Sequence, residues 1–493
     1  MRRVALAAAA LLLASLVHAQ DAAAVIDRAT GPSSHLESDL RVLTDQIGGR
    51  VTGSANYTRA LQWGMEAFRR AGVDSVRLET YPIPAQWEGI SATASVVSPS
   101  PIPLRVVSLG LTPSTPGAVT APLLDAGDGH RADFERLGAS ARGAIVLVHN
   151  KPMNSFEDLF AEYVNGPEIM QAAAEHGVAA LLFISTRPRD LLYRHTITWG
   201  PIAPLPMAQV AREDGLRLAR LVAEGTAPRV TLDVRNRVGG PGEAQNVVAE
   251  IRGTEKPDEI VLLGAHLDAW DLGTGALDNG VNCALVVDVA RVVAAGPRPK
   301  RTIRFVLFTG EEAGLLGSYG YVRAHRDELD RHVAVVIHDI GDGKIAGYYT
   351  NGRPDIDDPV RAVLAPVAPR GAGGVDEEAI LGTDNFDFLL EGVPNLVANQ
   401  DTSRYLADYH ASSDTFDKVD PDLARGNAAI AAVTVLGLAN APKRIGPRQS
   451  REEVLKILDD SRWKLAEQMK IYGVWPDWES GKRGRAPMTA GQR

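Results

Sequence analysis

Three short and almost uninterrupted apolar segments constrain the fold of this chain more than any other feature. They read IVLLGAH at 260–266, TIRFVLFT at 302–309 and AVVIHD at 334–339. A strand that is apolar on both faces belongs inside a mostly parallel sheet whose two faces are covered by helices. The stretch from Val281 to Val292, between the first two segments, repeats its apolar residues at helical spacing. We therefore predict an α/β fold with a mostly parallel central sheet and helices on both faces.

The first residues, 1–19, are typical of a removable signal peptide. A pair of arginines precedes an apolar stretch of about 14 residues, and Val17-His18-Ala19 forms a small-residue cleavage pattern. This stretch is shorter than the roughly 20 residues of a membrane-spanning helix. We expect a mature protein that is soluble, lies outside the cytoplasm (periplasmic or secreted) and keeps no membrane anchor.

The middle of the chain differs in texture from its flanks. Residues 118–238 hold short strand-like runs such as GAIVLVHN and AALLFIST, one helical stretch, and many Pro and Gly. We predict an inserted β-rich domain here, so that the main domain is built from residues 20–117 and 239–447. Residues 448–493 are predicted to form one amphipathic helix followed by a polar tail.

The overall charge limits the classes of partner. The formal net charge is −9, which argues against a nucleic-acid partner. Cys283 is the only cysteine, so no internal disulfide can form.

Histidines and carboxylates gather where the apolar segments end. In open α/β sheets, ligands bind beyond the carboxyl ends of the strands. The Gly-rich loop GTGALDNG adds one acid to the same set, and a second loop, ADYHASSDT, adds one histidine. Imidazole and carboxylate are the ligand types that suit a divalent cation such as zinc. The residues concerned are His266, Asp268, Asp278, Glu311, Glu312, Asp339 and His410.

Charge balance indicates two metal ions rather than one. Three carboxylate ligands and one hydroxide would bring four negative charges, which two divalent cations neutralise. In such sites one carboxylate usually bridges the ions, and Asp278 on its Gly-rich loop is the best candidate. We therefore predict two Zn²⁺ or other divalent transition metals, held by His266, Asp278, Glu312, Asp339 and His410.

Glu311 has no metal in this scheme and is free to act as a general base. It could take a proton from the water shared by the ions and pass it to the leaving amine. Asp268 lies two residues after His266 and could accept the second N–H of that imidazole, which would fix its tautomer.

At these residues the sequence resembles the co-catalytic di-zinc exopeptidases, which include leucyl aminopeptidases and glutamate carboxypeptidases. The blocks GAHLDAWDLGTGALDNG, FTGEEAGLLGS, HDIGDG and YHASSDT carry the resemblance in order and spacing. PKRTIRFVLFTGEE and GTDNFDFLLEGVP look most like the plasma glutamate carboxypeptidase branch. The insertion looks like a protease-associated domain.

The resemblance implies a role for each residue of the set. His266 and Asp339 would hold one zinc, Glu312 and His410 the other, with Asp278 as the bridge and Glu311 as the general base. Tyr409, or with less support Tyr405, would donate to the oxyanion of the tetrahedral intermediate. Asp384 matches a position near the substrate pocket. The implied activity is a secreted exopeptidase acting on short peptides or dipeptides.

Alternatives remain open at this point. The same site could have aminopeptidase specificity, and a glutaminyl cyclase on this fold would use a single zinc for acyl transfer. A binding module would use the insertion as its working part, and the intact ligand set argues against that. Peptide substrates are the expected partners, and the sequence leaves a homodimer open.

Overall fold

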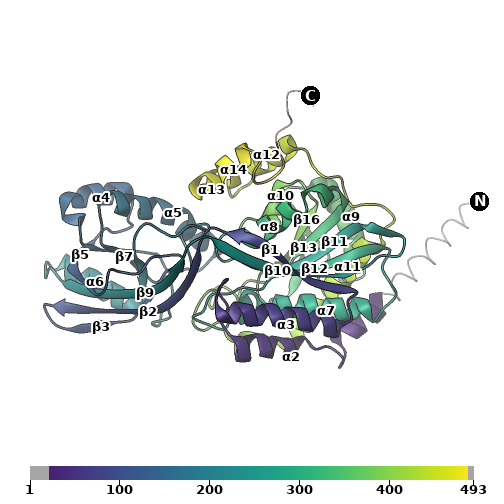
Figure 1. Cartoon of the computed structure of the whole chain (residues 1–493), viewed down its shortest axis with the longest axis horizontal. Coiled ribbons are helices and arrows are strands. Elements are labelled where there is room, and N and C mark those ends of the chain that lie inside the picture. Colours follow the sequence, from purple (N-terminus) through teal and green to yellow (C-terminus); the bar gives the residue numbers. More distant parts are fainter. Residues whose placement is uncertain (1–21, 487–493) are drawn as a thin grey trace, which may run out of the picture.

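The computed structural model describes residues 22–486 and divides them into two bodies, each built on an eight-stranded sheet (Figure 1). The predicted signal peptide and the last residues of the predicted tail lie outside the described residues. The larger body contains the three apolar segments as strands β11 (Lys256–His266), β12 (Arg301–Phe308) and β13 (His332–Ile337).

The sheet of the larger body has the order β1-β10-β12-β11-β13-β16-β14-β15. Its four central strands, from β12 to β16, run parallel, whereas β10 and β14 join them antiparallel. The predicted parallel arrangement is therefore confirmed for the central strands, whereas antiparallel strands flank them on both sides. The remaining strands are β1 (Ser75–Ile83), β10 (Gly242–Ile251), β14 (Ile345–Tyr349), β15 (Gly374–Asp376) and β16 (Asn395–Gln400).

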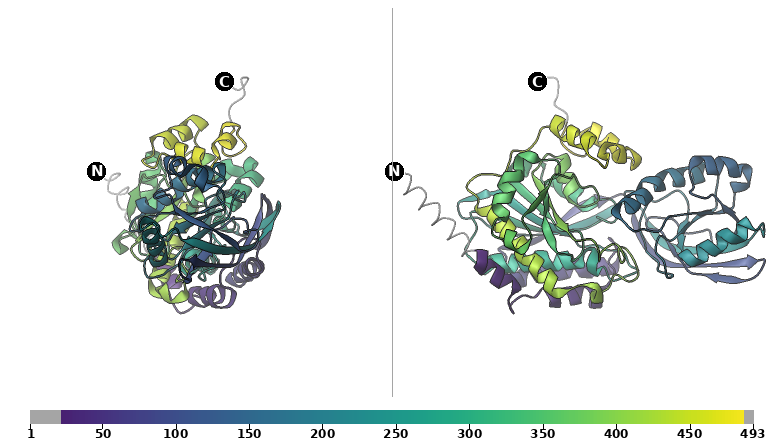
Figure 2. Two further views of the ribbon diagram at one scale, coloured as in Figure 1. Left: turned by 90° about the vertical axis from the view of Figure 1, so that its left-hand side faces the viewer. Right: turned by 180° about the vertical axis from the view of Figure 1, so that it is seen from behind.

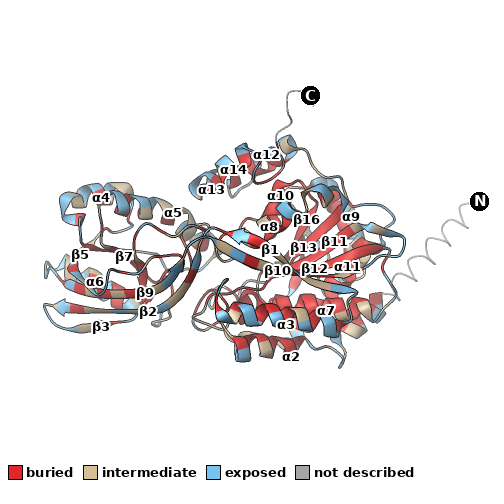
Figure 3. Cartoon of the chain, viewed as in Figure 1, coloured by how far each residue is buried: buried red, intermediate tan, exposed pale blue. Residues whose placement is uncertain are grey.

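Helices cover both faces of this sheet, which explains the near-continuous apolar runs. Along β11, Val261 and Leu263 pack in the cluster that contains the residues of α7 (Val281–Ala294), while Leu262 packs on the opposite face with Tyr321 and Phe388. Both faces of the strands are buried (Figure 3). The first face also carries α2 (Leu36–Arg41), α3 (Ala55–Ala71), α9 (Pro354–Leu364) and α11 (Pro421–Asn440), and the second carries α8 (Leu316–Ala324) and α10 (Asn385–Leu390).

The second sheet belongs to the insertion and has the order β3-β2-β9-β5-β6-β7-β8-β4. Its strand β2 (Gln86–Ser98) pairs along almost its whole length with β9 (Arg229–Gly239). The predicted boundary at residue 118 therefore falls inside the insertion, because β2, β3 (Ile102–Leu104) and β4 (Val106–Ser108) come before it. Their alternating pattern is equally compatible with either sheet, and only the long-range pairing assigns them.

The remaining elements of the insertion enclose two apolar clusters, one on each side of β6 and β7. These elements are the strands β5 (Val119–Asp125), β6 (Ile145–Val148), β7 (Ala180–Ile184) and β8 (Met207–Val210), and the helices α4 (Arg131–Leu137), α5 (Phe156–Glu175) and α6 (Arg212–Ala223).

The insertion leaves and re-enters the main sheet at one place. Ile83 at the end of β1 pairs with Gly242 at the start of β10, and Gln86 pairs with Gly239 just beyond them. The two strands that lead into the insertion thus run side by side (Figure 1).

The carboxyl-terminal region forms three helices rather than the single helix predicted. They are α12 (Arg451–Asp460), α13 (Leu465–Ile471) and α14 (Trp475–Glu479). Their apolar residues pack with those of α10, and the views from two sides place them beside the insertion (Figure 2). Short helices separated by Gly473 and by a turn at Ser461 give too brief a periodic pattern for the sequence to separate them.

Within residues 22–486, α11 is the one helix with the length and apolar composition of a membrane span. In its most apolar window 67% of the residues are buried inside the protein, as expected for a core helix.

Candidate metal centre

The predicted metal ligands converge at the carboxyl edge of the central strands. His266 ends β11, Glu312 follows β12 and Asp339 follows β13. They lie close together because parallel strands bring their carboxyl ends to one edge of the sheet. Asp278 lies in the turn that leads into α7, and His410 lies in the loop after β16. Apart from Glu312, which is half-buried, these residues are buried.

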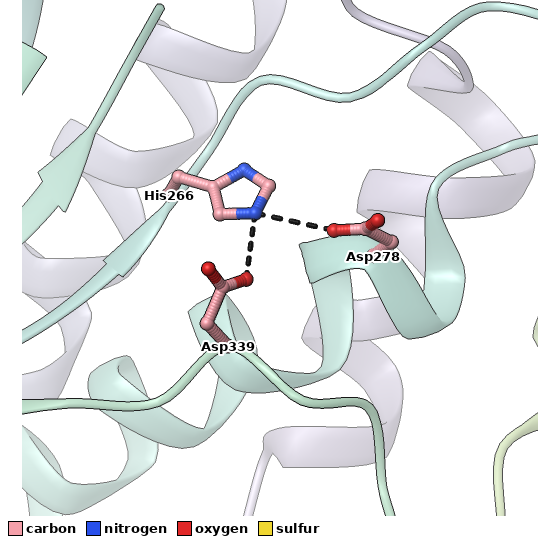
Figure 4. A group of neighbouring side chains, drawn as sticks. All are labelled: His266, Asp278 and Asp339. Atoms are coloured by element: carbon pink, nitrogen blue, oxygen red, sulfur yellow. Dashed lines mark ion pairs between the residues drawn. The ribbon is translucent and has the colours of Figure 1, made fainter. Parts of the chain in front are cut away.

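Three of the residues form a first triad around His266 (Figure 4). Its Nε2 atom lies 2.8 Å from Asp339 Oδ1 and 3.2 Å from Asp278 Oδ1. The three side chains come from β11, from the turn before α7 and from the segment after β13.

A second triad forms around His410 and shares Asp278 with the first. His410 Nε2 lies 2.9 Å from Glu312 Oε2 and 3.2 Å from Asp278 Oδ2. Within each triad the candidate ligand atoms lie within 4.8 Å of one another. Asp278 therefore offers one oxygen to each triad, which is the geometry of a bridging carboxylate.

The donor set fits divalent cations. The Nδ1–H of His266 donates to the main-chain carbonyl of Asp268 at 3.0 Å, which leaves the Nε2 lone pair facing two carboxylates. A lone pair and two carboxylate oxygens directed at one point repel each other unless a metal ion or a proton lies between them, and this donor set suits a divalent metal ion. Burial also raises the pKa of Glu312 to about 7, so a nearby positive charge is needed to keep this carboxylate ionised at neutral pH.

Asp268 supports the site in a different way from the one predicted. The His266 ring donates to the carbonyl of Asp268, and the Asp268 carboxylate oxygen is 3.8 Å from Nδ1. The carboxylate instead accepts the hydroxyl of Thr52 at 3.1 Å and the main-chain N–H of Glu311 at 3.3 Å. The prediction that this carboxylate holds the imidazole was wrong, because the main-chain carbonyl of Asp268 lies closer to Nδ1 than its carboxylate does.

Glu311 opens onto the cavity next to the two triads. Its Oε2 atom lies 4.0 Å from His266 Nε2, farther than either carboxylate of the first triad. Burial, followed by the charges of Asp339 and Glu312, raises the pKa of Glu311 well above its ordinary range.

The two tyrosines considered for the oxyanion both line the cavity, in different surroundings. The Tyr409 ring stacks on His410 with 3.7 Å between centroids, and its hydroxyl is 3.0 Å from that of Tyr163 in the insertion. Burial, followed by the charges of Asp278 and Asp339, raises the pKa of Tyr405 well above its ordinary range.

Asp384 is fully buried at the start of α10, next to Gly382 and Thr383, which line the cavity. This position is near the cavity, as predicted, and a contact between Asp384 and substrate stays a prediction.

Asp414 is a supporting residue that the sequence did not reveal. Its carboxylate accepts the main-chain N–H groups of Ala276, Leu277 and Asp278, at 3.1, 2.7 and 3.1 Å. It therefore fixes the turn that presents the shared ligand Asp278. Its position in YHASSDT, four residues after His410, was the available signal.

The site opens into a cavity of about 840 Å³. Its inner wall includes Glu311, Asp339 and Tyr405 from the larger body. Its outer wall is aromatic and comes from two other parts of the chain. Phe160 of α5 packs against Trp463 between α12 and α13, and Trp199 of the insertion stacks on Tyr472, each pair with 4.6 Å between ring centroids.

An α/β sheet that carries two candidate metal-binding triads with a shared carboxylate at its strand ends has the architecture of a metallohydrolase. The model of peptidase family M28 matches residues 246–435, which include all five candidate ligands. Carboxypeptidase Q of Rattus norvegicus is 30% identical over 406 residues, covering 81% of this chain and 84% of the relative. The chain therefore belongs to peptidase family M28, and it is a metallopeptidase.

Solved structures agree with this fold. The structure of a peptidase M28 precursor from Shewanella amazonensis superposes with a TM-score of 0.79 at 29% identity, covering 88% of this chain and 99% of the other. The zinc aminopeptidase BSAP from Bacillus subtilis gives a TM-score of 0.64 at 22% identity over 81% and 93% of the two chains, which shows the shared fold alone.

Proposed function

We propose that this metallopeptidase is a two-zinc exopeptidase that hydrolyses short peptides or dipeptides. The observation that carries the proposal is the position of Asp278, whose two oxygens face His266 and His410 at 3.2 Å each. One ion would be held by His266, Asp278 and Asp339, and the other by His410, Asp278 and Glu312. Such ions polarise the scissile carbonyl and lower the pKa of water, which supplies the nucleophile.

Glu311 has the position of the proton carrier. It lies at the cavity wall beside both triads without being part of either, and its main-chain N–H is held by Asp268. In the proposed reaction its carboxylate removes a proton from the attacking water and returns it to the nitrogen of the leaving amine.

Of the two tyrosines, we favour Tyr405 as the hydroxyl that donates to the oxyanion. After burial, the charge of Asp278 raises the pKa of both tyrosines, but a side-chain hydrogen bond to Asp278 also acts on Tyr405, whereas the Tyr409 hydroxyl is engaged by Tyr163. A donor near both triads can stabilise the charge that develops on the carbonyl oxygen.

The size and enclosure of the cavity favour short substrates. The inner wall comes from the larger body, and the insertion and the C-terminal helices provide the outer wall. A volume of about 840 Å³ is that of a site for a small ligand rather than for a long chain. We propose that the insertion is a protease-associated domain that limits substrate length, and that the enzyme is exported by its signal peptide.

The positive charge of Arg462 favours recognition of the carboxyl end of a peptide over its amino end. It is the one lysine or arginine among the described residues that line the cavity. Its side chain is 59% exposed and pairs with Glu157 and Glu378 at 3.2 and 3.3 Å, which are solvent-screened interactions of low strength. Arg462 is thus available to a free substrate carboxylate, which favours carboxypeptidase or dipeptidase action. Aminopeptidase action is the second candidate, because Glu157 and Glu378 could instead bind a free amine.

A panel of unblocked, N-acetylated and C-amidated dipeptides tests this proposal. We expect hydrolysis of unblocked and acetylated substrates and poor hydrolysis of amidated ones, and Arg462→Gln should remove the discrimination. Fast hydrolysis of amidated but not acetylated substrates would move the enzyme to the aminopeptidases. Internal cleavage of a long peptide blocked at both ends would exclude exopeptidase action altogether.

A further inference from the structure

The insertion contacts the main body at the loop that carries a candidate metal ligand. This loop, residues 404–414, is called the His410 loop here. The main chain of His410 is in the left-handed region, with φ of +57°, which is uncommon for residues other than glycine. Besides hydrogen bonds within the loop itself, the insertion supplies contacts that hold this conformation.

Tyr163 on α5 makes the side-chain contact. Its hydroxyl is 3.0 Å from the hydroxyl of Tyr409 and 3.5 Å from Nδ1 of His410. Because His410 Nε2 faces Asp278 and Glu312, Nδ1 is the atom through which a neighbour can orient the ring. The Tyr409 ring stacks on the same imidazole, so Tyr163 contacts both members of the stacked pair.

A second segment of the insertion, residues 187–194, holds the main chain of the His410 loop. The N–H of Arg194 donates to the carbonyl of His410, and the N–H of Ser412 donates to the carbonyl of Leu192, both at 3.0 Å. The guanidinium of Arg187 donates to the carbonyl of Tyr409, also at 3.0 Å. The loop is therefore bonded to the insertion on both sides of His410.

The two contacting segments are tied together inside the insertion. Tyr193 donates its hydroxyl to Glu162, the neighbour of Tyr163 on α5. Arg187 lies over the Tyr193 ring at 4.7 Å, and Arg194 is buried. The residues of the insertion that contact the His410 loop are thus held in place by interactions with one another.

We infer that Tyr163, with the segment 187–194, positions His410 for metal binding, so that the inserted domain completes one of the two metal sites. Tyr163 acts through His410 and is a positioning residue. The inference rests on the proposed two-metal function. Partners that orient a metal-bound histidine typically change metal affinity by 10- to 100-fold when they are removed.

The test is a titration of the metal-free full-length protein with Co²⁺, followed by visible absorption, for the wild type and for Tyr163→Phe. The variant keeps the ring and loses only the hydroxyl. We expect one of two bound ions to bind about 10-fold more weakly, with the other unchanged and with an altered absorption band for the weakened site. Arg187→Lys, which loses the bond to the Tyr409 carbonyl but keeps its charge, should weaken the same ion.

Tyr319→Phe is the matched control, because Tyr319 lies on α8 and its hydroxyl faces Lys482 at the surface. It should bind both ions like the wild type. Wild-type affinity and absorption for both ions in Tyr163→Phe and Arg187→Lys would overturn the inference while leaving the two-metal proposal intact. Failure of the wild type to bind two ions would instead overturn the proposed function.

Discussion

Glu311 and Glu312 are adjacent in the chain, yet their carboxylates have different neighbours. Glu312 Oε2 lies 2.9 Å from His410 Nε2, whereas Glu311 Oε2 lies 4.0 Å from His266 Nε2 and belongs to neither triad. Both residues lie in the bend and turn that follow β12, not in the strand itself. Two identical residues can therefore serve two roles.

Substitution of each glutamate by glutamine should separate these roles. Glu311→Gln should keep both metal ions and lose roughly 10²- to 10⁴-fold in kcat, because the proton carrier is gone while the ligands remain. Glu312→Gln should lose one metal ion first. Metal content per chain and kcat, measured on the same preparations, check both statements. The assignments are reversed if the Glu311 variant loses metal and the Glu312 variant does not.

Metal removal should inactivate the enzyme, and activity should return with two divalent ions per chain. The charge of three carboxylates in two triads is the reason. Asp278→Asn should weaken both ions together, since both triads share this side chain. Elemental analysis of the active protein provides the count. One zinc per fully active chain would rule out the two-metal mechanism and favour a cyclase-like acyl transfer.

Asp414→Asn should loosen the turn that carries Asp278. The amide nitrogen of asparagine cannot accept the N–H groups that the carboxylate now accepts, and each hydrogen bond to a charged group contributes about 1.5–3 kcal/mol. We expect a lower Tm in the metal-free protein and weaker binding of both ions. Asp417→Asn is the control, because that carboxylate is 69% exposed. A wild-type Tm and metal affinity in Asp414→Asn would show that the turn around Asp278 is stable without the Asp414 carboxylate.

The buried carboxyl of Glu162 should make stability depend on pH. Burial raises its pKa to about 7 from an ordinary value of 4.5. The folded state then holds a proton that the unfolded state releases, so stability present below pH 4.5 is lost as the pH rises through 7. With about 1.4 kcal/mol for each pKa unit, the loss is about 3 kcal/mol.

Glu162→Gln cannot lose this proton and supplies the comparison. Its free energy of unfolding, relative to that of the wild type, should increase between pH 4.5 and pH 8 in denaturant titrations. A constant difference across this range would show that Glu162 stays ionised in the folded protein.

The sequence predicted the central strands and their ligands because both depend on local pattern. Apolar runs define β11, β12 and β13, and the chemistry follows directly at their ends. The pairing of β2 with β9, more than a hundred residues away, leaves no mark on the alternation of either strand. The start of the insertion was therefore placed too late.

The supporting residues were hidden for a similar reason. Tyr163 lies on a helix of the insertion, 247 positions before the histidine it contacts, and nothing in the helical pattern distinguishes it from a packing residue. Asp268 was found by spacing, but its role depended on whether the carbonyl or the carboxylate reaches the ring, which two-residue spacing does not decide.

The two-stranded connection into the insertion has a mechanical consequence. Strands that run side by side from Ile83 and Gly242 form a natural hinge, on which an appended domain could rotate to admit substrate or release product. In this protein the insertion is also hydrogen-bonded to the His410 loop through Leu192 and Arg194. Rotation of the insertion about this hinge must therefore either move the His410 loop with it or break those hydrogen bonds. For the same reason, replacing the insertion by that of another enzyme requires replacing the His410 loop as well.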